Sequence, residues 1–407
     1  MKKSKYNIAV PYKDETILLF NTLTGAFIRI PEKKYNTTNE VLIKNKFVVP
    51  KENDEIDLYK YRYLAGIYAT RGCLITIAPT MLCNFCCPYC FEGENKRQGN
   101  MPTEVIEGVK KLLKSKSGKP LSITWFGGEP FLNWSGISEI SEYLINEGIK
   151  FSANAISNGS ICTERVLSDI DRFKIRSVQV TLDGCKEQHD QKRKYHNGAP
   201  SFDLIIANIH KLLEKTHTEI IIRVNLDRSN INSFADLQVY LKSQFSDALA
   251  TGRVRISPSP VQNRTEFDGC SNCLDGDEYG EFEYKIFRQK AQLPHPVGPC
   301  SLRCRSSIGV GPDGSIYKCL EHFGDVSKAI GSVVTSTVNL TKESDYAVGT
   351  LPFDLEECRN CSILPICGGS CAIDLSKYAK GQVHKPCLYT EELIKKMMIS
   401  YYETQNS

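Results

Sequence analysis

The sequence of 407 residues lacks any hydrophobic run near 18 residues, which excludes a predicted transmembrane helix. It also lacks a signal-peptide core, because the apolar stretch at Ile8–Pro11 is only four residues long. The formal net charge is small, at +4, and gives little reason to expect a nucleic-acid partner. With 41% apolar and 24% charged residues, the composition indicates a soluble globular protein. We therefore expect a cytoplasmic protein with neither a membrane nor a nucleic-acid partner.

Cysteine, by contrast, is abundant, with 17 residues. A chain without an export signal stays in a reducing compartment, where disulfides are rare, so this number indicates metal binding or catalysis. The cysteines are also clustered, with four between positions 83 and 90 and eight between positions 300 and 387. Two separate metal-binding regions are the simplest interpretation.

The middle of the chain alternates between strand and helix patterns. Apolar strands are expected at 74–79, 121–126, 151–157, 177–183, 220–226 and 252–257. Helices are expected near 102–114, 136–147, 162–172, 201–214 and 231–244. Repeated βα units with almost continuously apolar strands predict a parallel sheet, and six units are too few for a complete eight-fold barrel. We predict an α/β fold built on a partial (β/α)6 TIM barrel, with its active site at the carboxyl ends of the strands.

The segments on either side of this barrel, 73–260, have a different character. Residues 1–72 form a small β-rich domain, in which the strand-like stretches 16–20 and 26–30 are joined by a hairpin loop. Residues 261–299 form a linker with one helix near 278–290. Residues 300–390 are rich in Cys, Gly and Pro, so this segment needs a source of stability other than a hydrophobic core. Residues 391–407 form a C-terminal tail or helix.

The first cysteine cluster directly follows the first barrel strand. Cys83, Cys87 and Cys90 have the spacing Cys-x3-Cys-x2-Cys, and three thiolates on one short loop can hold three irons of a [4Fe–4S] cube. The fourth iron is then open to a substrate, whereas a structural zinc site normally has four ligands, and no fourth is local. The spacing Cys83-x2-Cys86-x3-Cys90 can also be drawn, but we take Cys86 as a spectator.

This motif, followed by the aromatic Phe91 and placed after the first strand of a partial barrel, resembles the radical S-adenosylmethionine (SAM) superfamily. The resemblance implies a reduced cluster that cleaves SAM to methionine and a 5′-deoxyadenosyl radical, which removes a hydrogen atom from an unactivated carbon. It also implies cosubstrate contacts at the ends of later strands. These would come from a GGE-like motif, an SNG-like motif, two polar residues of the fifth strand and the aromatic residue: Gly127, Gly128, Glu129, Ser157, Asn158, Arg223, Asn225 and Phe91. A plain salt bridge is the competing role for Arg223.

The stretch Thr181–Gly184 with His189, Asp190 and Arg193 resembles one common in peptide-modifying members of this superfamily. Sequence alone leaves two roles open for His189 and Arg193. Each is either structural or faces the substrate.

The second cysteine cluster resembles the SPASM domain, the twitch-extended C-terminal domain of radical maturases. The resemblance implies two fully ligated auxiliary [4Fe–4S] clusters, and therefore three clusters in all. Auxiliary cluster I would be held by Cys300, Cys304, Cys319 and Cys371, and auxiliary cluster II by Cys358, Cys361, Cys367 and Cys387. A pair of zinc ribbons is the alternative. Without Cys300, the first auxiliary cluster would have an open iron for a substrate thiolate.

The resemblance implies a maturase that acts on a peptide or protein, with a flavodoxin- or ferredoxin-type protein as electron donor. Members that oxidise sulfatases have an Asp directly after the last hairpin cysteine, where this chain has Leu320. Glu321 or His322 could replace it as proton acceptor. The departure favours members that cross-link ribosomally made precursor peptides by a thioether or carbon–carbon bond, over sulfatase-type oxidation or epimerisation. Residues 1–72 would then bind the leader of the precursor by strand addition, in a winged-helix-like domain that looks truncated.

Overall fold

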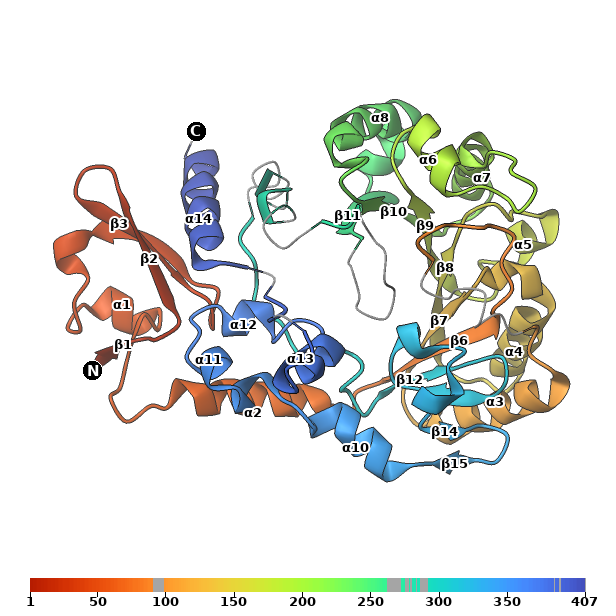
Figure 1. Cartoon of the computed structure of the whole chain (residues 1–407), viewed down its shortest axis with the longest axis horizontal. Helices are drawn as coiled ribbons and strands as arrows, with labels where there is room; N and C mark the ends of the chain where they lie inside the picture. Colours follow the sequence, from red (N-terminus) through yellow and green to blue (C-terminus); the bar gives the residue numbers. More distant parts are fainter. Residues whose placement is uncertain are drawn as a thin grey trace. The chain divides into compact units, whose positions relative to one another are not determined.

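The structure is a computed structural model. It describes residues 1–90, 99–261, 272–274, 278, 280–282, 284–285, 292–383, 385–387 and 389–406. The chain forms two compact units (Figure 1). The first, here called the composite unit, is assembled from Met1–Ala69, Asp275–Cys304 and Ser344–Ser407. The second, the barrel unit, is formed by Thr70–Leu274 and Arg305–Glu343.

The barrel unit contains six parallel strands in the order β11-β10-β9-β8-β7-β6. Their bounds are β6 (Cys73–Thr80), β7 (Leu121–Gly127), β8 (Phe151–Ser157), β9 (Ile175–Leu182), β10 (Glu219–Leu226) and β11 (Val254–Pro260). All six predicted strands are present, with boundaries displaced by at most three residues. Neighbours in sequence are neighbours in the sheet, which is the strand order of a (β/α) barrel and not that of a doubly wound sheet. The predicted α/β partial barrel is confirmed.

Helices connect these strands and lie along one side of the sheet (Figure 1). They are α3 (Thr103–Lys116), α4 (Trp134–Asn146), α5 (Glu164–Asp169), α6 (Lys186–Lys192), α7 (Phe202–Lys215) and α8 (Phe234–Ala250). In α3 the buried side chains include Val105, Ile106, Val109 and Leu113, which share one face because their spacing follows the helical period. Helix α6 was not expected from the sequence.

The Cys-rich region contributes a hairpin to the barrel sheet. Strand β12 (Ser307–Val310) pairs in parallel with β6 and antiparallel with β13 (Ser315–Tyr317). Strands β14 (Gly331–Ser332) and β15 (Thr337–Val338) continue this antiparallel edge. Gly314 lies in the turn between β12 and β13 and has a φ of +82°, which favours glycine.

The N-terminal part of the composite unit is β-rich, as predicted. Strands β2 (Asn7–Tyr12), β3 (Thr16–Asn21) and β4 (Phe27–Pro31) form an antiparallel sheet with β3 in the centre. Strands β1 (Lys2–Lys3) and β5 (Val48–Val49) form a second pair. Helices α1 (Glu40–Lys44) and α2 (Glu55–Ile67) complete this segment.

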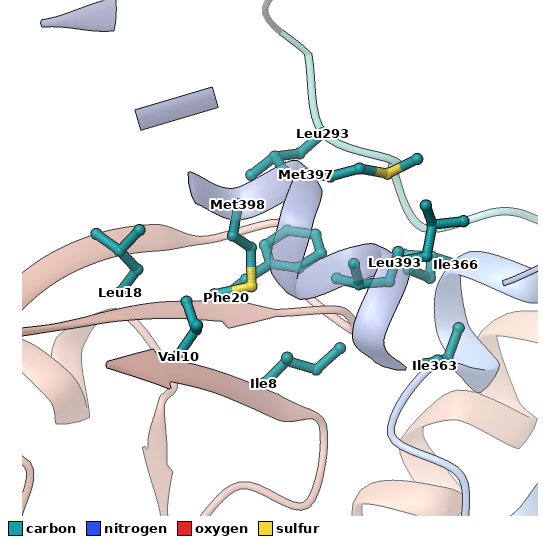
Figure 2. Close-up of a cluster of buried hydrophobic side chains, with 11 residues drawn as sticks. Ile8, Val10, Leu18, Phe20, Leu293, Ile363, Ile366, Leu393, Met397 and Met398 are labelled. Carbon is teal, nitrogen blue, oxygen red and sulfur yellow. The ribbon is translucent and has the colours of Figure 1, made fainter. Parts of the chain in front are cut away.

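Helix α14 (Glu391–Gln405) packs on one face of the N-terminal sheet. Figure 2 shows the cluster in which Ile8, Val10, Leu18 and Phe20 meet Leu393, Met397 and Met398 of this helix, together with Ile363 and Ile366. The opposite face, which includes Ile17 and Leu19, packs on Leu42, Phe47 and Val48. Both faces of the sheet are therefore buried within the unit.

Short helices fill the rest of the C-terminal region: α10 (Leu340–Val348), α11 (Glu356–Arg359), α12 (Leu364–Cys367) and α13 (Ala372–Ala379). Residues 300–390, taken as one segment in the sequence prediction, thus contribute to both units. Of the helix predicted near 278–290, residues 278, 280–282 and 284–285 are helical and the others lie outside the described residues. No helix in the described part of the chain is long and apolar enough to cross a membrane.

Candidate active site

The cluster loop, residues 81–90, leaves the barrel at the carboxyl end of β6. The pairing of β6 with β7 shifts register between Ile77 and Thr80, just before the loop begins. Thr80 then accepts a hydrogen bond from the backbone of Leu82 at 3.1 Å, and Met81 is buried. Because its first residues are fixed in this way, the loop starts from a defined point at the end of the strand.

The three predicted cluster ligands lie on this loop. Burial raises the pKa of the Cys83 thiol to about 12 and that of Cys87 to about 11, while Cys90 is exposed. The thiols of Cys87 and Cys90 both act electrostatically on Cys83, so the three lie near one another. Among the described residues no group of three His, Cys, Asp or Glu side chains is already arranged to hold a metal ion. The three thiols are the ligand type that an iron–sulfur cluster needs, and they lie near one another. Their side chains must still converge to bind the cluster.

The fourth thiol of this loop, that of Cys86, is directed to a different segment. Its Sγ lies 3.6 Å and 3.5 Å from the carbonyl oxygens of Lys194 and Tyr195. This contact supports the prediction that Cys86 is a spectator.

Gly127 and Gly128 allow β7 to approach the cluster loop. A Cβ atom on Gly127, whose φ is +117°, would lie 2.1 Å from the carbonyl oxygen of Thr80. A Cβ on Gly128 would lie 2.5 Å from the carbonyl oxygens of Met81 and Leu82. In this structure the glycines are therefore required by the backbone of the loop itself, a closer constraint than the ligand contact expected from the sequence.

Glu129 is completely buried and joins three elements of the site. Its carboxylate accepts hydrogen bonds from the backbone of Phe131 (3.0 Å) and of Asn158 (2.7 Å) and from the hydroxyl of Ser157 (3.0 Å). Burial raises its pKa to about 7, although these hydrogen bonds act in the opposite direction. The structure thus brings Glu129, Ser157 and Asn158 together, as the sequence predicts, and couples the ends of β7 and β8.

Asn158 also reaches the cluster loop. Its amide donates to the side chain of Asn84 at 2.8 Å, and its oxygen accepts from the hydroxyl of Ser160 at 2.6 Å. Asn84 in turn donates to the hydroxyl of Ser160 at 2.9 Å. Asn158, which was predicted to contact SAM, therefore also fixes Asn84, the residue next to Cys83.

A second connection holds the other half of the loop. The phenol of Tyr89 donates to the carboxylate of Asp183 at the end of β9 and accepts from the guanidinium of Arg193 at 2.9 Å. Asp183 is completely buried and Arg193 is 9% exposed. Sequence reasoning selected Arg193 without a role and passed over Tyr89, although its place between Cys87 and Cys90 was a usable signal.

Arg223 and Asn225 lie on β10 and extend this network. The Nε of Arg223 donates to Asn225 at 2.9 Å, and the amide of Asn225 contacts the phenol of Tyr89 at 3.4 Å. Both predicted cosubstrate residues are therefore connected to the cluster loop.

His189 has a structural role. Its Nδ1 accepts from the backbone of Asp183 at 3.3 Å and its Nε2 lies 3.0 Å from the hydroxyl of Ser201. Burial lowers its pKa to about 3, so the imidazole is neutral. This side chain is 0% exposed, which removes it from the candidates that could face a substrate.

The cysteines predicted for auxiliary cluster II lie in the composite unit. Cys358 is buried in an apolar cluster with Tyr6, Tyr59 and Tyr63, and Cys361 packs against it. The thiols of Cys367 and Cys387 act electrostatically on Cys358, and burial raises the pKa of the Cys358 thiol to about 11. This set therefore fits a cluster site by type and neighbourhood.

The cysteines predicted for auxiliary cluster I are divided between the units. Cys300, Cys304 and Cys371 belong to the composite unit, whereas Cys319 belongs to the barrel unit. Glu321 and His322 follow Cys319 on a single 3₁₀ turn, and His322 is buried. The predicted cosubstrate contact Phe91 and the cysteine Cys270 lie outside the described residues.

Comparison with known proteins identifies the class. A family model described as the Radical SAM superfamily matches residues 77–237, which include the cluster loop, Glu129 and Asn158. This chain carries a radical SAM domain and is a radical SAM enzyme, so the predicted resemblance is confirmed. Its class implies a [4Fe–4S] cluster and SAM as cofactors.

Two curated relatives span most of the chain. The radical SAM cyclopropyl synthase TigE of Paramaledivibacter caminithermalis is 20% identical over 87% of this chain and 80% of its own length. The cysteine-type anaerobic sulfatase-maturating enzyme of Clostridium novyi is 25% identical over 71% of this chain and 84% of its own length.

Two solved structures share the fold. Native anSMEcpe with bound AdoMet and Cp18Cys peptide has a TM-score of 0.61 and 19% identity, and the match covers 81% of this chain and 96% of that one. SuiB of Streptococcus suis bound to precursor peptide SuiA has a TM-score of 0.57 and 13% identity, and covers 97% of this chain and 99% of that one.

Proposed function

We propose that this enzyme is a radical SAM maturase that abstracts hydrogen from a ribosomally made precursor peptide and installs a cross-link, either a thioether or a carbon–carbon bond. The proposal includes a SPASM domain with two auxiliary [4Fe–4S] clusters, held by the eight cysteines from Cys300 to Cys387. A flavodoxin- or ferredoxin-type protein would supply the electron.

The extent of the structural matches is the observation that carries this proposal. The fold shared with SuiB, whose structure holds a precursor peptide, covers 97% of this chain, whereas the fold shared with anSMEcpe covers 81%. A chain built like SuiB along almost its whole length is expected to take the same class of substrate. TigE, which matches 87% of the chain, is named for forming a ring within its substrate.

The residues of the barrel unit would prepare the site for this chemistry. Cys83, Cys87 and Cys90 would hold the cluster, which together with SAM would supply the radical chemistry for hydrogen abstraction. Glu129, Ser157 and Asn158 fix the ends of β7 and β8 where the cosubstrate binds, and Arg223 can hold its carboxylate.

Sulfatase-type oxidation is the second candidate, and the relative from Clostridium novyi favours it. Against it, Leu320 follows Cys319 where an aspartate base is expected. Glu321 and His322 are the proton acceptors that this candidate would require.

We also propose that the N-terminal sheet binds the leader of the precursor, with β2 or β4 as the receiving edge, because each pairs with β3 alone within its sheet.

Coexpression with a small peptide encoded beside the gene, followed by mass spectrometry, tests the function. A cross-link removes two hydrogens and leaves no carbonyl that reacts with hydrazine, whereas formylglycine formation gives such a carbonyl. Cys87→Ala coexpressed with the same peptide is the control. An unmodified peptide beside a modified sulfatase would refute the proposal and establish the alternative.

Leader binding needs its own test. Deleting residues 1–72 would also strip Ile8, Val10, Leu18 and Phe20 from the packed cluster with α14, so loss of binding would not be informative. Proline substitutions along the edges are cleaner. Arg29→Pro on β4 and Ala9→Pro on β2 remove backbone N–H donors that point away from β3, and unchanged peptide affinity in both would contradict strand addition.

A further inference from the structure

The composite unit contains a group of buried tyrosines beside the auxiliary-cluster cysteines. Tyr6 precedes β2, and Tyr59 and Tyr63 lie one turn apart on α2. Their side chains are 0%, 4% and 3% exposed. All three belong to one apolar cluster with Cys358 and Phe353, so the N-terminal segment and the C-terminal region share this core.

Two of these tyrosines leave their hydroxyls unsatisfied. Neither Tyr6 nor Tyr59 has a hydrogen-bond partner for its phenol among the described residues, although both oxygens are buried. Tyr63, by contrast, donates to the carbonyl oxygen of Gly368 at 3.4 Å. A buried tyrosine hydroxyl normally finds a partner, because leaving it unpaired costs more than replacing the residue by phenylalanine.

Both tyrosines share their apolar cluster with cysteines, because Cys358 belongs to it and Cys361 packs against it. The thiol of Cys361 acts electrostatically on Tyr6, and those of Cys358 and Cys367 act on Tyr59. These are three of the four ligands proposed for auxiliary cluster II. A tyrosine hydroxyl carries its hydrogen at neutral pH, so both phenols are available as hydrogen-bond donors.

We propose that Tyr6 and Tyr59 are positioning residues of auxiliary cluster II and donate their hydroxyl hydrogens to its sulfur atoms. Binding of the cluster would then give the two buried hydroxyl groups hydrogen-bond acceptors, namely its sulfur atoms. Hydrogen bonds to cluster sulfur stabilise the extra negative charge of the reduced state and therefore raise the reduction potential. The N-terminal segment is thereby part of the auxiliary-cluster site.

This inference rests on the proposed auxiliary clusters, but not on which bond the enzyme forms. Tyr→Phe substitutions distinguish this role from a role in core packing alone, because the two roles predict opposite effects. If the hydroxyls were only core groups, Tyr→Phe would remove an unsatisfied donor and leave the protein as stable or more stable. If they bind cluster sulfur, the same change weakens cluster binding.

The test uses the anaerobically reconstituted full chain with Tyr6→Phe, Tyr59→Phe and the double variant. Tyr61→Phe is the matched control, because Tyr61 lies on the same helix and is 73% exposed. Redox titration followed by electron paramagnetic resonance gives the potential of each cluster, and chelator challenge gives the rate of iron loss.

We expect the potential of one auxiliary cluster to shift to a more negative value in each single variant and further in the double variant. We also expect that cluster to lose iron about tenfold faster, in line with the usual effect of removing a hydrogen bond next to a ligand. The SAM-responsive signal of the radical cluster and the Tyr61→Phe control should match wild type.

Two outcomes would overturn the proposal, and they are distinguishable. Wild type with about twelve irons, combined with unmoved potentials in the double variant, refutes the role of the tyrosines alone. Wild type with about four irons removes the auxiliary clusters themselves and with them this inference.

Discussion

The barrel unit and the composite unit are built on different principles. The barrel unit takes most of its residues from one continuous segment, Thr70–Leu274, in which each strand lies beside the next in sequence. The composite unit combines three separate segments, and a single apolar cluster joins Ile8 to Met398. The first unit is therefore specified by local patterns repeated along the chain, and the second by contacts between distant segments.

The same contrast applies to the cysteines. In the barrel unit, three proposed ligands lie within eight consecutive positions on one loop, held by Glu129, Asn158 and the phenol of Tyr89. In the composite unit, seven proposed ligands are spread between Cys300 and Cys387, and three of them, Cys358, Cys361 and Cys367, lie in or against apolar clusters. Cluster assembly is thus expected to matter for reactivity in the barrel unit and for stability in the composite unit.

The largest effect is expected from Cys87→Ala. Loss of one of three thiolates on the loop should reduce formation of 5′-deoxyadenosine to background while about eight auxiliary irons remain. Iron analysis and chromatography of the nucleoside product measure both. Cys86→Ala should retain activity, and its inactivation would instead favour the Cys83–Cys86–Cys90 ligand set.

The core of the composite unit can be broken separately. Ile394→Ala removes a completely buried side chain of α14, and we expect a loss of about 2–5 kcal/mol in the free energy of unfolding of this unit. Hydrogen exchange should report faster opening of β2 and β3 with the barrel strands unaffected. Glu392→Ala, an exposed change on the same helix, is the control, and equal destabilisation of both units would show that they unfold together.

Glu129 predicts a pH effect within the barrel unit. Its pKa is about 7 in the folded protein and 4.5 ordinarily, so between these values the folded state binds a proton that the unfolded chain releases. The stability from this group is complete below pH 4.5 and decreases as pH rises through 7, by up to about 3 kcal/mol. Thermal unfolding at pH 5 and pH 8 should show a smaller difference in Glu129→Gln than in wild type. An exposed change, Glu139→Gln on α4, should keep the wild-type slope.

The smallest effect is expected for Tyr89, whose hydroxyl anchors the cluster loop to Asp183 and Arg193. Tyr89→Phe keeps the ring but removes the hydroxyl that joins Asp183 and Arg193, and we expect the SAM-responsive signal to disappear about tenfold faster under chelator challenge. Tyr143→Phe on α4 provides a matched loss of a hydroxyl at a distance from the loop. Identical decay in the two variants would mean that the anchor does not hold the loop.

Much of the barrel unit could be predicted from the sequence, because its information is local. The strand at 151–157 was predicted to the residue. The network around Tyr89 could not be predicted in this way. Its members are 94 and 104 residues from Tyr89 in sequence, and only the closed arrangement of strand ends brings them together.

The composite unit was less predictable for the same reason. Residues 391–407 were expected to form a tail or a helix, but no pattern in them indicates that the helix α14 covers the N-terminal sheet. The orphan hydroxyls of Tyr6 and Tyr59 were likewise invisible in sequence, since both residues look like ordinary apolar positions. The resemblance to the SPASM domain predicts that the cysteines are ligands, but it does not indicate which side chains surround them.

The packing of α14 on the first sheet has a consequence for synthesis on the ribosome. Phe20 leaves the exit tunnel long before Leu393 is made. At about 5–20 residues per second, the apolar face of the sheet therefore remains without α14 for roughly 20 to 80 seconds. The barrel segment can fold during that interval, because its strands arrive in the order in which they pair. Slow translation would therefore expose the N-terminal sheet to aggregation or to chaperones, and accelerated elongation near the end of the message should improve the yield of intact enzyme.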